Sequence, residues 1–171
     1  TGNVTAQSAF DVGGLAGRAL DISFSSATGN VSGSGTKDGA SIGGLVGDAQ
    51  SNTIQQSYAT GSVTGGQYDY VGGISAGSST IKDSYSTGSV QGGAQALVGG
   101  FSAGGISTGS YSTGFVSVTN TQHRKLLRRQ VGGFAVFGLI ELERDYWDID
   151  TSGTDIGCAY KHKRCRHVTG L

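Results

Sequence analysis

The chain has 171 residues, with 32 glycines, no proline, no methionine and a formal net charge of zero, a composition far from that of an ordinary globular domain. No apolar run approaches the roughly 18 residues of a membrane helix, and most basic residues are gathered in two short stretches, 123–129 and 161–166. We therefore exclude a membrane span and a nucleic-acid binder, which usually spreads a basic face over its fold, and expect a periodic structure.

A glycine-centred phrase recurs five times along the chain. It reads VGGLAG, IGGLVG, VGGISA, VGGFSA and VGGFAV, at spacings of 30, 29, 27 and 33 residues. The copies begin at Val12, Ile42, Val71, Val98 and Val131. We expect these five residues to form one apolar column, with neighbouring members about 4.8 Å apart as in paired strands.

A second phrase follows the first in four repeats. It reads ISFSSATGNV, IQQSYATGSV, IKDSYSTGSV and ISTGSYSTGFV, with copies that begin at Ile22, Ile54, Ile81 and Ile106. Tyr58, Tyr85 and Tyr111 form a second predicted column. Strict alternation from Ile81 would turn Tyr85 inward, so we expect a bend before the tyrosine. The glycine of each TG pair is expected to take a positive φ, and the paired glycines of the first phrase to allow close backbone approach.

These units predict stacked strands. A unit of about 30 residues with two or three short β-prone stretches cannot bury an apolar face alone, and no 3.6-residue stripe indicates helices. We predict an all-β fold, a parallel β-helix or solenoid of about five coils over residues 1–157, right-handed as parallel crossovers usually are. Residues 158–171 are predicted as a basic tail or junction, and the chain as a fragment of a longer polypeptide.

The phrases IGGLVG and IQQSYATGSV resemble the GLUG repeat of large bacterial and archaeal surface proteins, including filamentous-haemagglutinin-like adhesins and non-catalytic regions of some immunoglobulin A peptidases. The resemblance covers about residues 1–157, and YWDIDTSG at 146–153 looks like the phrase that often follows such an array. It implies a β-solenoid in an exported, often adhesive protein, with no catalytic residues to carry over. HRKLLRR and GCAYKHKRCRH depart from the repeat pattern.

We therefore expect a structural or interaction segment of an exported, extracellular or cell-surface, adhesin-like protein, which binds or spaces and is not an enzyme. No cofactor or metal is expected. Its partners would be flanking domains of the same chain and a host or neighbouring-cell glycan or protein. The alternative is a non-catalytic accessory region of a larger secreted enzyme such as an immunoglobulin A peptidase. A third reading is a carbohydrate-active β-helix enzyme, suggested by Asp145, Asp148 and Asp150 beside Trp147.

Two motifs suggest chemistry but are interpreted as repeat columns. Ser75 and Ser102 lie in G-x-S-x-G, the pattern of a nucleophile elbow, yet they occupy one repeat column and no helix pattern follows them. One threonine per repeat precedes glycine, which is what a turn needs, although an outward threonine array could also bind ice or a carbohydrate lattice. These threonines are Thr28, Thr60, Thr87 and Thr113.

Two clusters near the end of the chain are the candidate sites. Cys158 and Cys165, the only cysteines, could form a disulfide in an oxidising compartment; with His162 and His167 they could hold zinc, although the spacing matches no common finger. A basic cluster is the candidate contact for an anionic ligand such as a sulfated glycan or lipid headgroup. It consists of His123, Arg124, Lys125, Arg128 and Arg129.

We predict that deleting residues 121–129 preserves cooperative unfolding, because surface loops tolerate length changes at small entropic cost, and weakens binding to host glycans or cells. Thermal melting and a cell-binding assay measure the two effects. Loss of cooperative unfolding would place the segment in the core, and unchanged binding would place the contact elsewhere.

Overall fold

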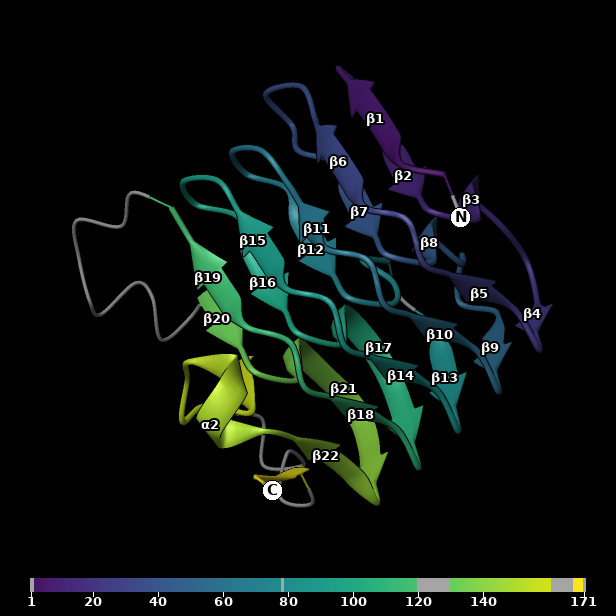
Figure 1. Cartoon of the computed structure of the whole chain (residues 1–171), viewed down its shortest axis with the longest axis vertical. Coiled ribbons are helices and arrows are strands. Elements are labelled where there is room, and N and C mark those ends of the chain that lie inside the picture. Colours follow the sequence, from purple (N-terminus) through teal and green to yellow (C-terminus); the bar gives the residue numbers. More distant parts are fainter. Residues whose placement is uncertain (1, 78, 120–129, 161–167, 171) are drawn as a thin grey trace.

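The computed structural model describes residues 2–77, 79–119, 130–160 and 168–170, which form a parallel β-solenoid (Figure 1). The chain passes through the same sheets in each coil, and the described strands of every sheet pair in parallel. One sheet follows the TG turns and contains β1 Val4–Gln7, β6 Val31–Ser34, β11 Val63–Thr64, β15 Val90–Gly92 and β19 Val116–Val118. The next sheet carries the first phrase and contains β2 Asp11–Gly13, β7 Ser41–Gly43, β12 Tyr70–Gly72, β16 Leu97–Gly99 and β20 Val131–Gly132.

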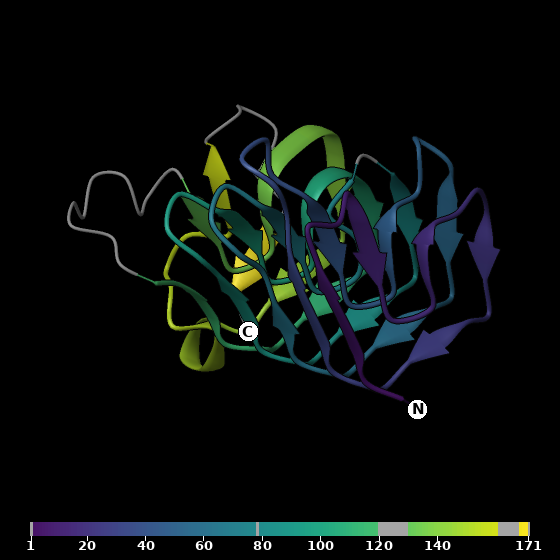
Figure 2. The same cartoon turned by 90° about the horizontal axis from the view of Figure 1, so that it is seen from above.

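The second phrase runs through two further sheets, which later segments extend. One contains β4 Ile22–Ser23, β9 Thr53–Gln55, β13 Thr80–Lys82, β17 Ser102–Thr108, β21 Ala135–Glu143 and β23 Cys158–Tyr160. The other contains β5 Ser26–Ala27, β10 Tyr58–Ala59, β14 Tyr85–Ser86, β18 Tyr111–Ser112, β22 Asp145–Trp147 and β24 Val168–Gly170. A short pair joins β3 Ala16–Arg18 to β8 Val46–Asp48. Successive coils lie over one another when the molecule is seen from above (Figure 2).

The register confirms the two predicted columns. Val12, Ile42, Val71, Val98 and Val131 are aligned strand to strand. Tyr58 is aligned with Tyr85 and Tyr85 with Tyr111. The predicted all-β parallel solenoid of about five coils is therefore confirmed.

The sheets continue past the boundary that we placed at residue 157. Strand β23 pairs with β21, and β24 pairs with β22. The segment Asp145–Trp147 is itself in repeat register, with Tyr146 aligned to Tyr111 and Trp147 to Ser112. A single turn of helix, α2 Ile149–Ser152, follows; it begins after Asp148, which caps it, and ends at Gly153 with φ of 72°. The phrase after the array thus starts as one more copy of the repeat.

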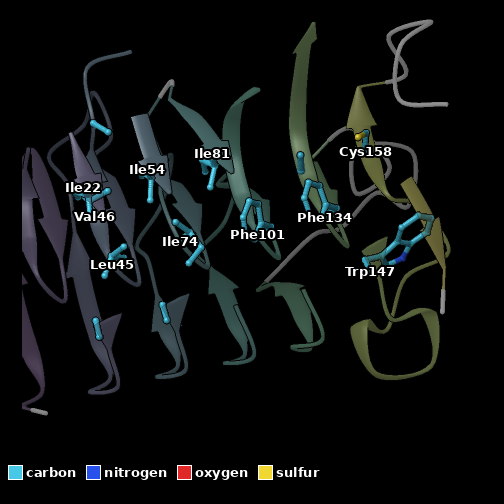
Figure 3. Close-up of a cluster of buried hydrophobic side chains, with 14 residues drawn as sticks. Ile22, Leu45, Val46, Ile54, Ile74, Ile81, Phe101, Phe134, Trp147 and Cys158 are labelled. Atoms are coloured by element: carbon cyan, nitrogen blue, oxygen red, sulfur yellow. The ribbon is translucent and has the colours of Figure 1, made fainter. Parts of the chain in front are cut away.

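The described residues form three apolar clusters, a small one around Ala103 and Val136 and two larger ones that follow the repeat columns. One of the larger clusters is made of the predicted valine and isoleucine column together with the valines that follow the TG turns, such as Val31, Val63 and Val90. In the other, shown in Figure 3, the column changes along the axis from Leu45 and Ile74 to Phe101 and Phe134, whose rings stack at 4.7 Å. Trp147 lies in this second cluster, near the C-terminal end of the described stack.

The glycines that follow Thr28, Thr60, Thr87 and Thr113 do not have the predicted positive φ. A Cβ on Gly61 would instead collide with the carbonyl oxygen of Gly29, and a Cβ on Gly88 with that of Gly61. The paired glycines of the first phrase show the predicted close approach, since a Cβ on Gly73 would collide with the carbonyl oxygen of Gly100. Both sets of glycines let successive coils pack backbone against backbone.

The bend before each tyrosine is present, and the residue that makes it is rarely glycine. Phe24, Gln56, Asp83 and Arg144 have φ between 47° and 56° at equivalent positions, and Gly109 has 66°. These left-handed residues break the alternation, so that the isoleucine and the serine on either side both point inward. The tyrosine that follows therefore points outward.

One predicted alignment is wrong by a residue. The fourth copy of the second phrase begins at Ile106, but Ile106 pairs with Thr80, and Ser107 takes the place of Ile81. The pairing keeps Tyr111 against Tyr85. The register changes because the segment from Ser102 to Ile106, which contains Gly105 with φ of 123°, is one residue shorter than the equivalent segment from Ser75 to Thr80. A buried serine thereby replaces isoleucine in the core column.

We predict that Gly88→Ala lowers the free energy of unfolding by roughly 1–3 kcal/mol, because the added methyl group collides with the neighbouring coil. Gly104→Ala is the matched control, since a Cβ there meets nothing within 4 Å. Urea denaturation of both variants measures the difference. Equal stability of the two would show that the coils can separate at the TG column without cost.

Candidate functional site

The predicted anionic-ligand cluster, His123, Arg124, Lys125, Arg128 and Arg129, lies outside the described residues, as do His162, Cys165 and His167. Cys158 is disulfide-bonded, and its pairing with Cys165 stays a prediction. Within the described ranges, no three His, Cys, Asp or Glu side chains are grouped to hold a metal ion.

Ser75 and Ser102 are buried and lie in one column, where isolated bridges link Val46 to Ser75 and Ser75 to Ser102. The Ser102 hydroxyl lies 2.9 Å from the carbonyl oxygen of Ser75 and 2.6 Å from that of Gly104. Neither serine stands on a strand-to-helix turn, which the nucleophile elbow requires. Their hydroxyls donate hydrogen bonds to backbone carbonyl oxygens of the stack.

The acidic residues near Trp147 have separate local roles. Asp145 is fully buried, whereas Asp148 caps α2 by accepting hydrogen bonds from the backbone N–H groups of Asp150 and Thr151. The Thr151 side chain and these amides lower the pKa of Asp148. The Trp147 indole N–H points to the carbonyl oxygen of Thr154 at 3.4 Å. Asp145 and Asp148 therefore each have a structural role, the first in a buried hydrogen-bond network and the second in helix capping.

A serine column that our sequence analysis did not single out links the coils beneath the tyrosines. The hydroxyl oxygen of Ser57 accepts the backbone N–H of Ser25, Ser84 accepts that of Ser57, and Ser110 accepts that of Ser84. Each hydroxyl in turn donates to a carbonyl two residues earlier in its own coil, as Ser57 does to Gln55 at 2.8 Å. In the sequence, the sign of this column was the serine that precedes each tyrosine of the second phrase.

Asp145 ends this serine column. Its Oδ1 accepts the backbone N–H of Ser110 at 2.8 Å and the Ser107 hydroxyl at 3.1 Å, while Oδ2 is buried without a hydrogen-bond partner among the described residues. Burial raises the pKa of Asp145 to about 6, and the two hydrogen bonds only partly oppose that rise. When protonated, the Asp145 carboxyl has an O–H group that can donate a hydrogen bond, as the serine hydroxyls of the column do.

The tyrosine column faces outward. Tyr58 and Tyr85 stack with ring centroids 5.0 Å apart and planes 2° apart, and Tyr85 and Tyr111 with 5.1 Å and 5°. Tyr58 and Tyr85 are half-buried and Tyr111 is exposed. Desolvation raises the pKa of Tyr85, and neighbouring Tyr111 and Tyr58 raise it further. The Tyr85 hydroxyl therefore stays protonated at neutral pH and can both donate and accept hydrogen bonds.

The loops at the opposite corner carry other exposed aromatics. Tyr68, with φ of 63°, and Tyr70 are 46% and 41% exposed. Between them, the buried carboxylate of Asp69 accepts backbone N–H groups of Gly66 in its own coil and of Gly35 and Ala40 in the preceding coil. This carboxylate ties two variable loops together.

A search of protein-family models, curated proteins and solved structures found no significant match to the chain. The resemblance to the GLUG repeat therefore stays a prediction. No helix among the described residues is long and apolar enough to cross a membrane.

We predict that Asp145 makes stability fall as pH rises. Its folded-state pKa, about 6, lies above the value of 3.8 for an unperturbed carboxyl, so the proton stabilises the folded state fully below about pH 4 and that stabilisation is lost as pH rises through 6. The expected loss over the full pH range is about 3 kcal/mol.

The matched variant is Asp145→Ser, which places in this column the residue that earlier coils have. Urea denaturation of both proteins at pH 4, 5, 6 and 7 isolates the effect, because other titrating groups cancel in the difference. A difference that does not change with pH would contradict the burial of this carboxyl as the cause.

Proposed function

We propose that this chain is a binding segment of an exported, adhesin-like cell-surface protein, which also spaces the parts attached to it and performs no catalysis. The observation that carries the proposal is that inward-facing polar groups are hydrogen-bonded to the backbone. Four inward-facing serines donate hydrogen bonds to backbone carbonyl groups, namely Ser57, Ser84, Ser102 and Ser110. The outer surface of the repeats is therefore the part that is available for recognition.

The shape of the solenoid supports the spacing role. Strand β1 lies at one end of the stack and β24 at the other, since each sheet adds one strand per coil (Figure 1). Each coil contacts mainly its neighbours, so such a body is rigid and extends with repeat number. The disulfide at Cys158 supports an oxidising location, where such bonds persist.

We expect beads coated with the chain to adhere to epithelial cells or extracellular matrix, and soluble chain to compete for that adhesion. Beads coated with an unrelated soluble protein of equal size are the control. Adhesion no greater than the control on every surface, or turnover of a peptide or polysaccharide substrate by the purified chain, would overturn the proposal.

A further inference from the structure

The stacked tyrosines present a row of hydroxyl groups at the spacing of the coils. Because the rings lie parallel at 5.0 and 5.1 Å, the inner ring faces cover each other. Ring edges and hydroxyls therefore remain for a ligand. A partner that bonds to each hydroxyl in turn must repeat at about the same distance along the solenoid axis.

Few biological polymers have this repeat. An extended peptide advances about 3.3 Å per residue and stacked bases about 3.4 Å, so neither matches successive hydroxyls. A chain of β-linked pyranose sugars in an extended conformation advances by about one ring length per sugar, which is close to the coil spacing. Such a glycan can place one sugar beside each coil.

The chemistry of the surface fits an uncharged glycan. The strand and turn that carry each tyrosine read YATG at Tyr58 and YSTG at Tyr85 and Tyr111, with no charged residue, and the exposed charges just before Tyr85, Lys82 and Asp83, are of opposite sign. Tyrosine combines an apolar ring with a hydroxyl that donates and accepts. Sugars offer the complementary combination of C–H groups and hydroxyls.

The first tyrosine also has a ring face without an aromatic neighbour. Tyr58 is aligned with Ser26 in the preceding coil, so no ring stacks on that side. Phe24, close by in the same coil as Ser26, is 76% exposed. A sugar beside this coil can lay its C–H face on Tyr58, while the following sugars contact the hydroxyls of Tyr85 and Tyr111.

We propose that the column Tyr58, Tyr85 and Tyr111 binds an uncharged, extended β-linked glycan that runs along the solenoid axis, with one sugar per coil. This inference rests on the proposed binding function and names its ligand class. The spacing of the ladder favours a β-(1→4)-linked chain, since an α-(1→4)-linked chain of the same sugars coils and cannot keep successive sugars at successive coils.

The test measures binding of the chain to insoluble cellulose and chitin by sedimentation, and to cellohexaose by calorimetry. Maltohexaose, which has the same sugars in α-linkage, is the ligand control. We expect cellohexaose to bind and maltohexaose to bind at least tenfold more weakly. Absence of binding to all three β-linked probes, or equal binding of both hexaoses, overturns the proposal.

Three variants locate the site. Tyr85→Phe keeps the stacked ring and removes the hydroxyl, and we expect it to weaken cellohexaose binding about threefold or more. Tyr58→Ser introduces the residue already present at Ser26, and we expect at least tenfold loss. Tyr70→Ser removes an exposed tyrosine from a different sheet and should change binding less than twofold. Melting curves establish that each variant is folded.

Two outcomes separate this inference from the proposed function. Unchanged adhesion and unchanged glycan binding by Tyr85→Phe and Tyr58→Ser would remove the glycan site and leave the adhesive role standing. A second copy of this chain also repeats at the coil spacing, so the oligomeric state is measured in parallel. A dimer that Tyr58→Ser dissociates, without glycan binding by the monomer, assigns the column to self-association and overturns the proposal.

Discussion

The structure depends on the close approach of backbone between successive coils. At the TG column and at the paired glycines, a single added carbon would collide with a carbonyl oxygen of the neighbouring coil. Glycine at these positions lets the strands of all sheets pair at once. This contact sets the distance between successive coils. It therefore also sets the spacing within the valine and isoleucine column, between the stacked phenylalanines and between the outward tyrosines.

Stacking also determines how buried polar groups are satisfied. Each serine of the inner column accepts an N–H from the preceding coil, so the column needs a further acceptor at its C-terminal end. Asp145 supplies it with one carboxylate oxygen, but the other remains buried and unpartnered. The same coil introduces the large indole of Trp147 in place of Ser112. The repeat thus changes its chemistry where the regular array ends.

Interior and outward-facing residues are consequently under different constraints. Interior residues are constrained by neighbouring coils, which explains why the two G-x-S-x-G serines are hydrogen-bonded to backbone carbonyls. Outward residues are constrained only where they stack on each other, as the tyrosines do. The outer surface therefore repeats a pattern of tyrosine hydroxyls at a constant interval along the solenoid axis.

The sequence by itself determined the parallel solenoid and its apolar and tyrosine columns, because equivalent residues of a repeat must stack in register. It did not reveal that Gly61 and Gly88 serve close packing rather than a positive φ, since both uses select glycine. Only the tertiary structure decided that Ser107 takes the place of Ile81 and that Asp145 ends the serine column. Those outcomes depend on which residues each strand pairs with and on where one coil is a residue shorter than the one before it. A repeat pattern contains no information on either.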